Sequence, residues 1–260
     1  MRTAFIGSGM MDYAWIDAFG FSRSFARLGQ RTLLVWLVDE EPPLQYAVHD
    51  GGDGLGKKGF PFGLQSDEDV QDAIRPCTEP NLDVMWFRKR PAQLDMALSC
   101  MHDMSSFLSD KLNAVSDGYV HVILAGYEEQ YRHLSISMLM AADSLVLSVD
   151  VAQYSLDDIV RLLVNIGTVS YQSKQRLSVE AVCLRGYDAR LQSSQLVRNE
   201  LMMIFNAKVL DSALPSMRHS SPPSSVWVTN GNELAYQRLA NEISPRMSRT
   251  ASAIKRRQRA

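Results

Sequence analysis

The sequence predicts an α/β protein with a doubly wound, mostly parallel sheet of about seven strands flanked by helices. Three observations lead to this prediction. Stretches typical of strands alternate strictly with stretches typical of helices along the chain. Residues 5–39 read as strand, loop, helix and second strand, which is one βαβ unit. Thr32–Val38 is continuously apolar, as expected of a strand buried on both faces of a parallel sheet.

In this opening unit, a strand at Thr3–Ile6 leads into a turn at Gly7–Gly9. Apolar residues then recur at helical spacing from Trp15 to Leu28, so that one face of this helix can pack on the sheet. Gly29 follows and is expected to end the helix in the left-handed conformation. The second strand, Thr32–Val38, completes the unit.

A long segment from Asp39 to Pro80 is rich in Gly, Pro and acids and reads mostly as loop, with one candidate short helix at Asp67–Ile74. The remaining predicted elements alternate in type. They are a strand at Leu82–Phe87, a helix at Leu94–Leu112, a strand at Tyr119–Ala125, a helix at Leu134–Ala142, a strand at Ser144–Val149, a helix at Leu156–Ile166, a strand at Val179–Leu184, a helix at Ser194–Phe205, a strand at Lys208–Ala213 and a helix at Asn232–Ile243.

The chain has 260 residues and 46% apolar composition, enough to bury a sizeable core in one domain. We place this domain at residues 1–245, with the long loop at about 40–80. The formal charge of −2 conceals an asymmetry, because residues 246–260 carry basic side chains and no acid. This tail is poor in apolar residues, so we expect it to be disordered.

No apolar run is long enough to span a membrane, and the N-terminus lacks the basic and apolar regions of a signal peptide. We therefore expect a cytoplasmic protein, with peripheral association at the inner membrane as an option. Cys77, Cys100 and Cys183 lack metal-binding spacing, which predicts free, buried thiols. The five histidines show no ligand or triad spacing, and His121 reads as a hydrogen-bonded core residue.

The loop after the first strand lies where α/β proteins bind phosphates, at the amino end of a helix. A P-loop needs glycines, a lysine and a Ser or Thr for magnesium. Here Met10, Met11 and Tyr13 stand instead, and Asp12 would repel phosphate. Gly7–Gly9 matches the first half of a dinucleotide-binding motif, but Asp12 stands at its third glycine. A tight turn that merely joins strand and helix is the alternative.

Three pieces of the sequence carry a family resemblance. Residues 138–166 contain Ala-Asp before a strand and Tyr-Ser-Leu at the start of a helix. Residues 184–205 contain a Tyr-Asp-x-Arg turn, and residues 209–220 a strand followed by a proline turn. In this order the pieces resemble the ParA/MinD family of deviant-Walker P-loop ATPases, which position plasmids, chromosomes, division sites and secretion machines. The resemblance implies a P-loop NTPase-like sheet over nearly the whole chain.

The resemblance also aligns the opening unit with the family's nucleotide site, where glycines and charged residues are replaced. The replacements are Gly9 at the signature lysine, Tyr13 at the last loop glycine, Ala14 at the P-loop lysine, Trp15 at the magnesium-binding threonine, Trp36 and Val38 at the second-strand aspartates, and Ala125 at the Walker B aspartate. Phosphoryl transfer depends on these charges. The alignment therefore predicts a pseudo-ATPase, not an enzyme, with no catalytic residue, no metal site and no ATP or magnesium cofactor.

In the ATP-bound family members, the nucleotide face is also a dimer face. Here it would present aromatic residues and methionines, which suit protein contacts. The alternative is that these residues fill the vacated site as core. The degenerate loop and candidate interface comprise Gly7, Gly9, Met10, Met11, Tyr13, Ala14, Trp15, Trp36 and Ala125.

We therefore expect an accessory, scaffold or localisation subunit of a bacterial secretion, pilus or exopolysaccharide apparatus, for instance for cellulose. Its partner would be a second copy, an intact ParA/MinD-type ATPase or a membrane-associated complex. A partition-type protein that binds DNA non-specifically and an atypical nucleotide-binding ATPase are the alternatives. Basic side chains would bind nucleic acid or anionic lipid. The candidate polyanion-binding residues are Arg185, Arg190, Arg218, Lys255, Arg256, Arg257 and Arg259.

Overall fold

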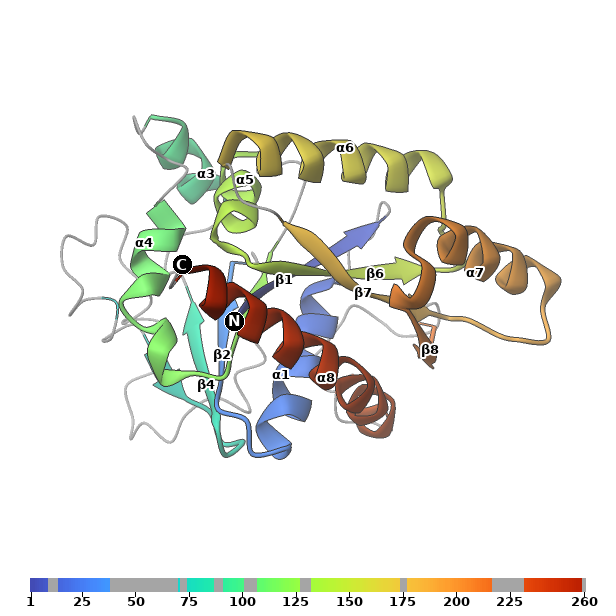
Figure 1. Ribbon diagram of the computed structural model, residues 1–260, viewed down its shortest axis with the longest axis horizontal. Coiled ribbons are helices and arrows are strands. Elements are labelled where there is room, and N and C mark those ends of the chain that lie inside the picture. Colours follow the sequence, from blue (N-terminus) through green and yellow to red (C-terminus); the bar gives the residue numbers. More distant parts are fainter. Residues whose placement is uncertain are drawn as a thin grey trace.

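The computed structural model describes residues 1–8, 14–37, 70, 74–86, 91–100, 107–126, 132–173, 177–216 and 232–258. Within these residues the centre of the molecule is one eight-stranded sheet in the order β3-β4-β2-β5-β1-β6-β7-β8 (Figure 1). Neighbouring strands are parallel except β3 and β4, which are antiparallel. The predicted doubly wound, mostly parallel α/β fold is confirmed, with one strand more than expected.

Strands and helices alternate along most of the chain. The strands are β1 (Arg2–Ser8), β2 (Thr32–Trp36), β3 (Ile74–Pro76), β4 (Leu82–Trp86), β5 (His121–Ala125), β6 (Ser144–Asp150), β7 (Ser178–Arg185) and β8 (Val209–Leu214). The helices are α1 (Ala14–Arg27), α3 (Pro91–Ser99), α4 (Phe107–Asn113), α5 (Arg132–Ala141), α6 (Leu156–Ser173), α7 (Gln192–Phe205) and α8 (Glu233–Gln258).

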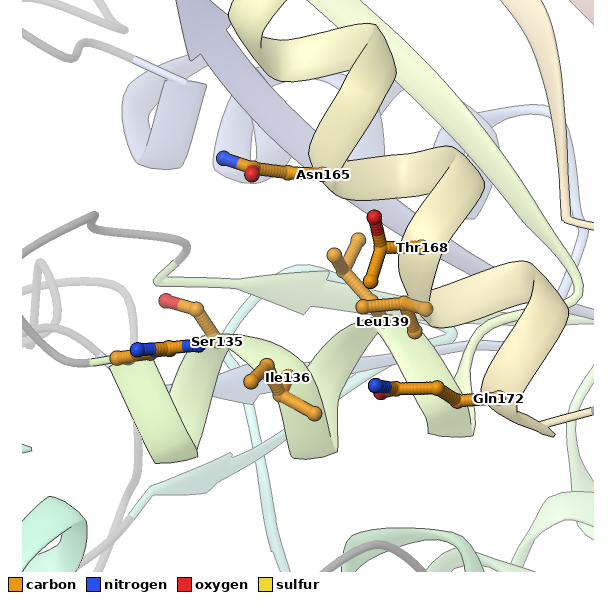
Figure 2. A pocket seen from close by; sticks show the side chains of 8 residues that line it. Ser135, Ile136, Leu139, Asn165, Thr168 and Gln172 are labelled. Atoms are coloured by element: carbon orange, nitrogen blue, oxygen red, sulfur yellow. The ribbon is translucent and has the colours of Figure 1, made fainter.

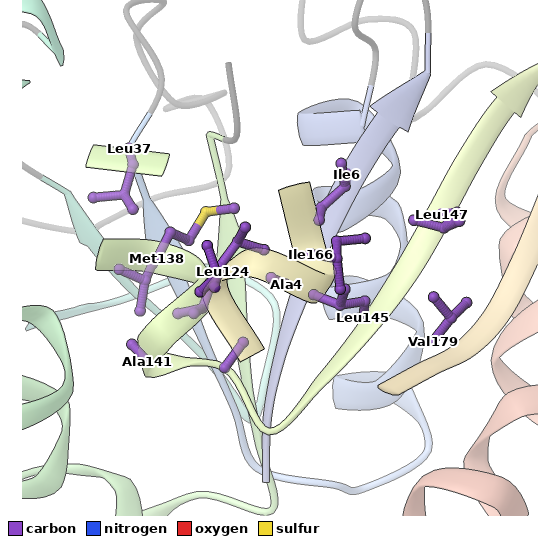
Figure 3. Close-up of a cluster of buried hydrophobic side chains, with 14 of the residues drawn as sticks. Ala4, Ile6, Leu37, Leu124, Met138, Ala141, Leu145, Leu147, Ile166 and Val179 are labelled. Carbon is purple, nitrogen blue, oxygen red and sulfur yellow. The ribbon is translucent and has the colours of Figure 1, made fainter. Parts of the chain in front are cut away.

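The sheet separates two hydrophobic cores, because successive residues of a strand point to opposite faces. On one face, Ala4 and Ile6 of β1 join apolar side chains from helices α3 to α7. Figure 3 shows part of this core, including Met138 of α5 and Ile166 of α6. On the other face, Phe5 packs against α1 and α8. The β1 strand lies between β5 and β6, so its carboxyl end is in the middle of the sheet edge where ligands of such folds bind.

Gly29 ends α1 as expected from the sequence. Its φ of +74° is in the left-handed region, and its N–H donates to the Ala26 carbonyl over 2.9 Å. The N–H of Gln30 donates to the Phe25 carbonyl over 3.1 Å, which completes a Schellman-type cap.

Two predicted boundaries are wrong. The single helix at Leu94–Leu112 is instead two helices, α3 and α4. The Ser99 hydroxyl donates to the Met96 carbonyl over 2.6 Å where α3 ends, a local bond that competes with helix continuation. The candidate helix at Asp67–Ile74 and the long loop lie mostly outside the described residues, and Ile74 belongs to β3.

The predicted disordered tail is also wrong over most of its length, because α8 continues to Gln258. Met247 is buried against the core shared with α1, which anchors the helix beyond the predicted boundary at residue 245. The hydroxyls of Ser248 and Ser252 donate to carbonyls one turn earlier, so these polar residues fit the helix. None of the helices in the described part of the chain could span a membrane.

Candidate functional site at the β1–α1 edge

The candidate site lies where β1 ends and α1 begins, beside the carboxyl ends of β2 and β5. We call this region the β1–α1 edge. Parallel pairing places Ala125 of β5 level with Phe5 of β1 and with Trp36 of β2. The residues that join Ser8 to Ala14 lie outside the described part, and with them the predicted site residues Gly9, Met10, Met11 and Tyr13.

Two tryptophans pack against each other at this edge. The Trp15 and Trp36 rings meet edge to face, with centroids 5.4 Å apart and an interplanar angle of 82°. Trp36 is 2% exposed, Ala14 2% and Ala125 0%, whereas Trp15 is half-buried. Trp36, Ala14 and Ala125 therefore belong to the core. This agrees with the alternative in which these residues fill the vacated site instead of forming an interface.

The β2 and β5 ends approach each other closely beside this pair. The Leu37 N–H donates to the Ala125 carbonyl over 2.8 Å. Gly126 has a φ of +129°, and a Cβ there would lie 2.7 Å from the Leu37 backbone. Only glycine fits this position, so the chain leaves β5 in a conformation that brings no side chain toward β2.

A buried polar network lies one helical turn into α1. Asp17 accepts hydrogen bonds from the guanidinium of Arg185 at the end of β7 and from the Ser148 hydroxyl of β6. The Tyr236 hydroxyl of α8 donates to Asp17 over 2.8 Å, and Arg185 also donates to the Tyr236 hydroxyl over 3.1 Å. Arg185 Nη1 donates to the Pro215 carbonyl over 3.1 Å. One carboxylate thus connects α1, β6, β7 and α8.

The charges in this network stabilise one another. Burial lowers the pKa of Arg185, but the Asp17 carboxylate and the Tyr236 hydroxyl outweigh that effect and raise it above its usual value. Burial and the Asp17 carboxylate raise the pKa of Tyr236 well above its usual range. The same two causes raise the pKa of the Cys183 thiol, so this cysteine is protonated and inert at neutral pH.

The sequence pointed to Arg185 as a polyanion-binding residue, and that prediction is wrong. Its side chain is 1% exposed and already pairs with Asp17. Arg190 is exposed and forms an ion pair with Asp188 over 2.7 Å. Arg218 and Arg259 lie outside the described residues, and the side chains of Lys255, Arg256 and Arg257 do as well. A basic surface shared by these residues therefore remains a prediction.

The thiols and histidines carry no further chemistry among the described residues. No disulfide and no His, Cys, Asp or Glu group suited to a metal ion is found there. Cys183 is buried as predicted, but Cys77 is only partly buried and Cys100 is exposed. His121 is confirmed as a core residue, because its Nε2 lies 2.8 Å from the Gln30 amide oxygen and its ring stacks on Phe25.

A separate cavity of about 260 Å³ lies between α5 and α6 on another part of the surface (Figure 2). It is lined by Arg132, Ser135, Ile136, Leu139, Asn165, Thr168, Val169 and Gln172. Four of these eight residues are polar and uncharged, three are apolar and Arg132 is basic, and none of them belongs to the β1–α1 edge. The cavity is therefore distinct from the candidate site.

Sequence reasoning missed Asp17, Ser148 and Tyr236. One signal was available, because Asp17 interrupts the apolar residues of the α1 segment in the first turn of the helix. A carboxylate on a buried helix face requires a cationic or hydrogen-bonding partner. The identity of that partner could not be read from the sequence, since Arg185 is 168 positions away.

Comparison with known proteins identifies the family to which this chain is similar. A family model described as an AAA domain matches residues 21–179. The sporulation initiation inhibitor protein Soj of Bacillus subtilis is 30% identical over 162 residues, which cover 62% of this chain and 64% of Soj. The chromosome partitioning protein ParA of Caulobacter vibrioides strain NA1000 / CB15N is 25% identical over 241 residues, 88% of each chain.

The fold has solved counterparts. The chain is similar to cobyrinic acid a,c-diamide synthase from Mycobacterium smegmatis, with a TM-score of 0.69, 16% identity and 93% coverage of both chains. It is also similar to McdA from Cyanothece, with a TM-score of 0.64, 12% identity and coverage of 98% of this chain and 100% of McdA.

One prediction about cofactors is corrected by these comparisons. From the sequence we did not expect ATP or magnesium. The M. smegmatis synthase has been solved with ADP and magnesium and with an ATP analogue and magnesium, and McdA as an ATP complex. These ligands of similar proteins conflict with our expectation, which is therefore withdrawn. Through the matched AAA domain, the Soj and ParA relatives and the eight-stranded sheet, the chain belongs to the ParA/MinD-type P-loop ATPase family.

Proposed function

We propose that the chain is a ParA/MinD-type protein that acts through protein contacts and does not hydrolyse ATP. Its role would be that of an accessory, scaffold or localisation subunit of a bacterial secretion, pilus or exopolysaccharide apparatus. The observation that carries the proposal is the Trp15–Trp36 pair, with centroids 5.4 Å apart, at positions that the family alignment assigns to magnesium binding and catalysis.

Hydrolysis of ATP requires charged groups around the γ-phosphate and the attacking water. Ala14, Trp36 and Ala125 stand at charged positions of the alignment, and all three are at most 2% exposed. A rearrangement that brought charge to these points would need different side chains, because alanine and tryptophan carry none. Asp17, the nearest described acid in α1, is already bonded to Arg185, Ser148 and Tyr236.

Nucleotide binding and hydrolysis are separable properties in this proposal. Backbone N–H groups at the start of a helix bind phosphate without any lysine, and α1 begins at the required place. ATP with magnesium is therefore the first ligand to test. In this proposal the backbone at the start of α1 holds the phosphate beside Trp15. No described carboxylate takes part in catalysis.

The test is phosphate release from ATP with magnesium, run beside a calorimetric titration of the same sample. We expect release at the level of buffer, whatever the titration shows. A Trp15→Ala variant is the matched control, because it opens the edge without adding a charge. The proposal would be overturned if phosphate-releasing activity eluted together with the chain and its rate changed in the Trp15→Ala variant.

A partition-type role is the second candidate, and two observations favour it. Soj and ParA are among the relatives found, and ParA is named as a chromosome partitioning protein. The α8 helix carries the basic residues Lys255, Arg256 and Arg257 near its end. Retention of the chain on DNA should then fall steeply with rising salt and weaken in a K255E/R256E variant. Retention equal to that of an acidic control protein would exclude this role.

A further inference from the structure

We propose that the outward face of α6 is a surface on which a second copy of this chain packs, with the two α6 helices antiparallel about a twofold axis. This inference goes beyond the proposed function, because it concerns a surface separate from the β1–α1 edge. We call the residues involved the α6 stripe. They are Leu156, Val160, Val164, Gly167 and Tyr171.

The stripe follows from helical spacing. Its residues are separated by steps of three and four, which place them on one face of a helix. At about 1.5 Å per residue the stripe spans about 22 Å. The opposite face of α6 carries Ile159, Leu162, Ile166 and Val169, which are buried in the core. The helix is thus apolar on two faces, and the fold covers one of them.

The stripe is well exposed to solvent. Leu156 is 46% exposed, Val160 50%, Val164 61% and Tyr171 87%. Figure 1 shows α6 at the outer edge of the molecule. Isolated exposed apolar residues are ordinary, but a continuous row of them marks an interaction surface. The cavity beside α5, lined in part by Asn165, Thr168 and Gln172 of α6 (Figure 2), includes no residue of the stripe.

Gly167 is an independent observation. It lies inside α6 on the exposed face, and a Cβ built there meets nothing within 4 Å. The fold therefore does not need a glycine at this position, although glycine destabilises a helix interior relative to alanine. A glycine on an outward face permits close approach of another chain. This is the property expected at the centre of a helix contact.

The stripe is complementary to itself in the antiparallel arrangement. Its midpoint lies between Leu163 and Val164, so Leu156 of one chain lies opposite Tyr171 of the other, and Val160 lies opposite the open space above Gly167. The charged residues of the exposed face, Asp157 and Arg161, are in the first half of the helix, and residues 162–173 carry no charge. Antiparallel pairing therefore brings each charged half against an uncharged half, without like charges in contact.

One helix pair buries less than the roughly 800 Å² per partner of a standard interface, so we expect a weak, reversible dimer. The test is sedimentation velocity on the full chain between about 1 and about 200 µM, with and without ATP and magnesium. We expect a concentration-dependent dimer that does not require nucleotide. A chain that stays monomeric over this range would overturn the proposal.

Matched variants locate the contact. Val164→Lys should abolish the dimer, whereas Asn165→Lys adds the same charge to the next exposed residue, off the stripe, and should preserve it. Tyr171→Ser, at a side chain without a packing role in the fold, should weaken the dimer and serves if the lysine variant does not fold. Gly167→Ala should raise the thermal midpoint of the monomer while weakening dimerisation, since the added methyl fills the contact.

A dimer unaffected by Val164→Lys and Tyr171→Ser, or one equally weakened by Asn165→Lys, would overturn the proposal. A dimer lost only in Trp15→Ala would assign self-association to the β1–α1 edge and would also overturn it. None of these results bears on phosphate release, so the failure of this inference is distinguishable from the failure of the proposed function.

Discussion

Asp17 and Arg185 form an ion pair in which the two side chains are 0% and 1% exposed. Removing one partner of such a pair leaves a buried, uncompensated charge, which costs far more than the net stability that the pair provides. The pair therefore fixes how α1 sits against β7 and α8, more than it adds to the free energy of unfolding.

We expect Asp17→Asn to lower the free energy of unfolding by about 3–5 kcal/mol, because Arg185 then loses its counter-charge. Urea unfolding followed by circular dichroism measures the effect. The double variant D17L/R185M should cost less than the sum of its single variants, because no buried charge remains. Asp188→Asn, in an exposed pair with Arg190, is the control and should change little. Additive single effects would contradict the assignment.

His121 gives a pH dependence. Burial, followed by the positive N-terminus, lowers its pKa to about 4 from an unfolded value of about 6.5. The unfolded chain then binds the proton first, so the stability is complete above about pH 6.5 and is lost as the pH falls toward 4. We expect a loss of about 3 kcal/mol from this group across that window.

Urea unfolding of the chain and of His121→Phe at several pH values checks this prediction. The variant keeps an aromatic ring against Phe25 but has no titrating group, so its stability should fall less steeply between pH 6.5 and 4. Parallel curves for the two proteins would show that His121 is not the group responsible.

At the scale of elements, α1 and α8 pack so closely that position 20 of α1 has room only for glycine. A Cβ at Gly20 of α1 would lie 2.6 Å from ring carbons of Tyr236 in α8. The Tyr236 ring cannot easily move, because its hydroxyl bonds Asp17 and its ring packs edge to face on Phe21, with centroids 5.9 Å apart. The sequence shows only a glycine within a helical pattern.

We expect Gly20→Ala to lower the free energy of unfolding by about 1–3 kcal/mol through overpacking. Gly167→Ala, at a helical glycine with open space around it, should instead stabilise the monomer by up to about 1 kcal/mol. Thermal unfolding of both variants at low protein concentration compares the signs directly. A neutral or stabilising Gly20→Ala would mean that α8 does not pack on α1 as described.

The element boundaries that sequence missed have local physical causes. β3 has three residues and, among the described strands, pairs only with β4, so it leaves too short a pattern to detect. The end of α8 reads as a disordered tail by composition, yet Met247 anchors it against α1. Serine and arginine side chains there donate hydrogen bonds to carbonyls one turn earlier, so their polar groups are satisfied within the helix, which composition does not reveal.

At the scale of the whole molecule, the fold was predictable because buried parallel strands leave strong patterns. Thr32–Trp36 is entirely buried, as its continuous apolar sequence indicated. The candidate site was predictable only in part. The position of the β1–α1 edge followed from the βαβ unit, but the burial of Trp36 and the pairing of Arg185 depend on contacts between segments far apart in the chain.

The β1–α1 edge bears on both the family membership and the proposed function. The relatives are ATPases by family, whereas this chain has Ala14, Trp36 and Ala125 where the alignment expects charge. Positioning and electrostatic stabilisation supply nearly all of phosphoryl-transfer catalysis. The proposed function therefore predicts that turnover is abolished rather than slowed, while backbone groups can still hold a phosphate.

The most direct test of the proposed function is phosphate release from ATP with magnesium by the purified chain, measured across a size-exclusion peak. We predict release at the buffer level in every fraction, including fractions in which calorimetry detects bound nucleotide. Release that follows the protein peak and changes with Trp15→Ala would contradict it, and would make the chain a working ATPase of its family.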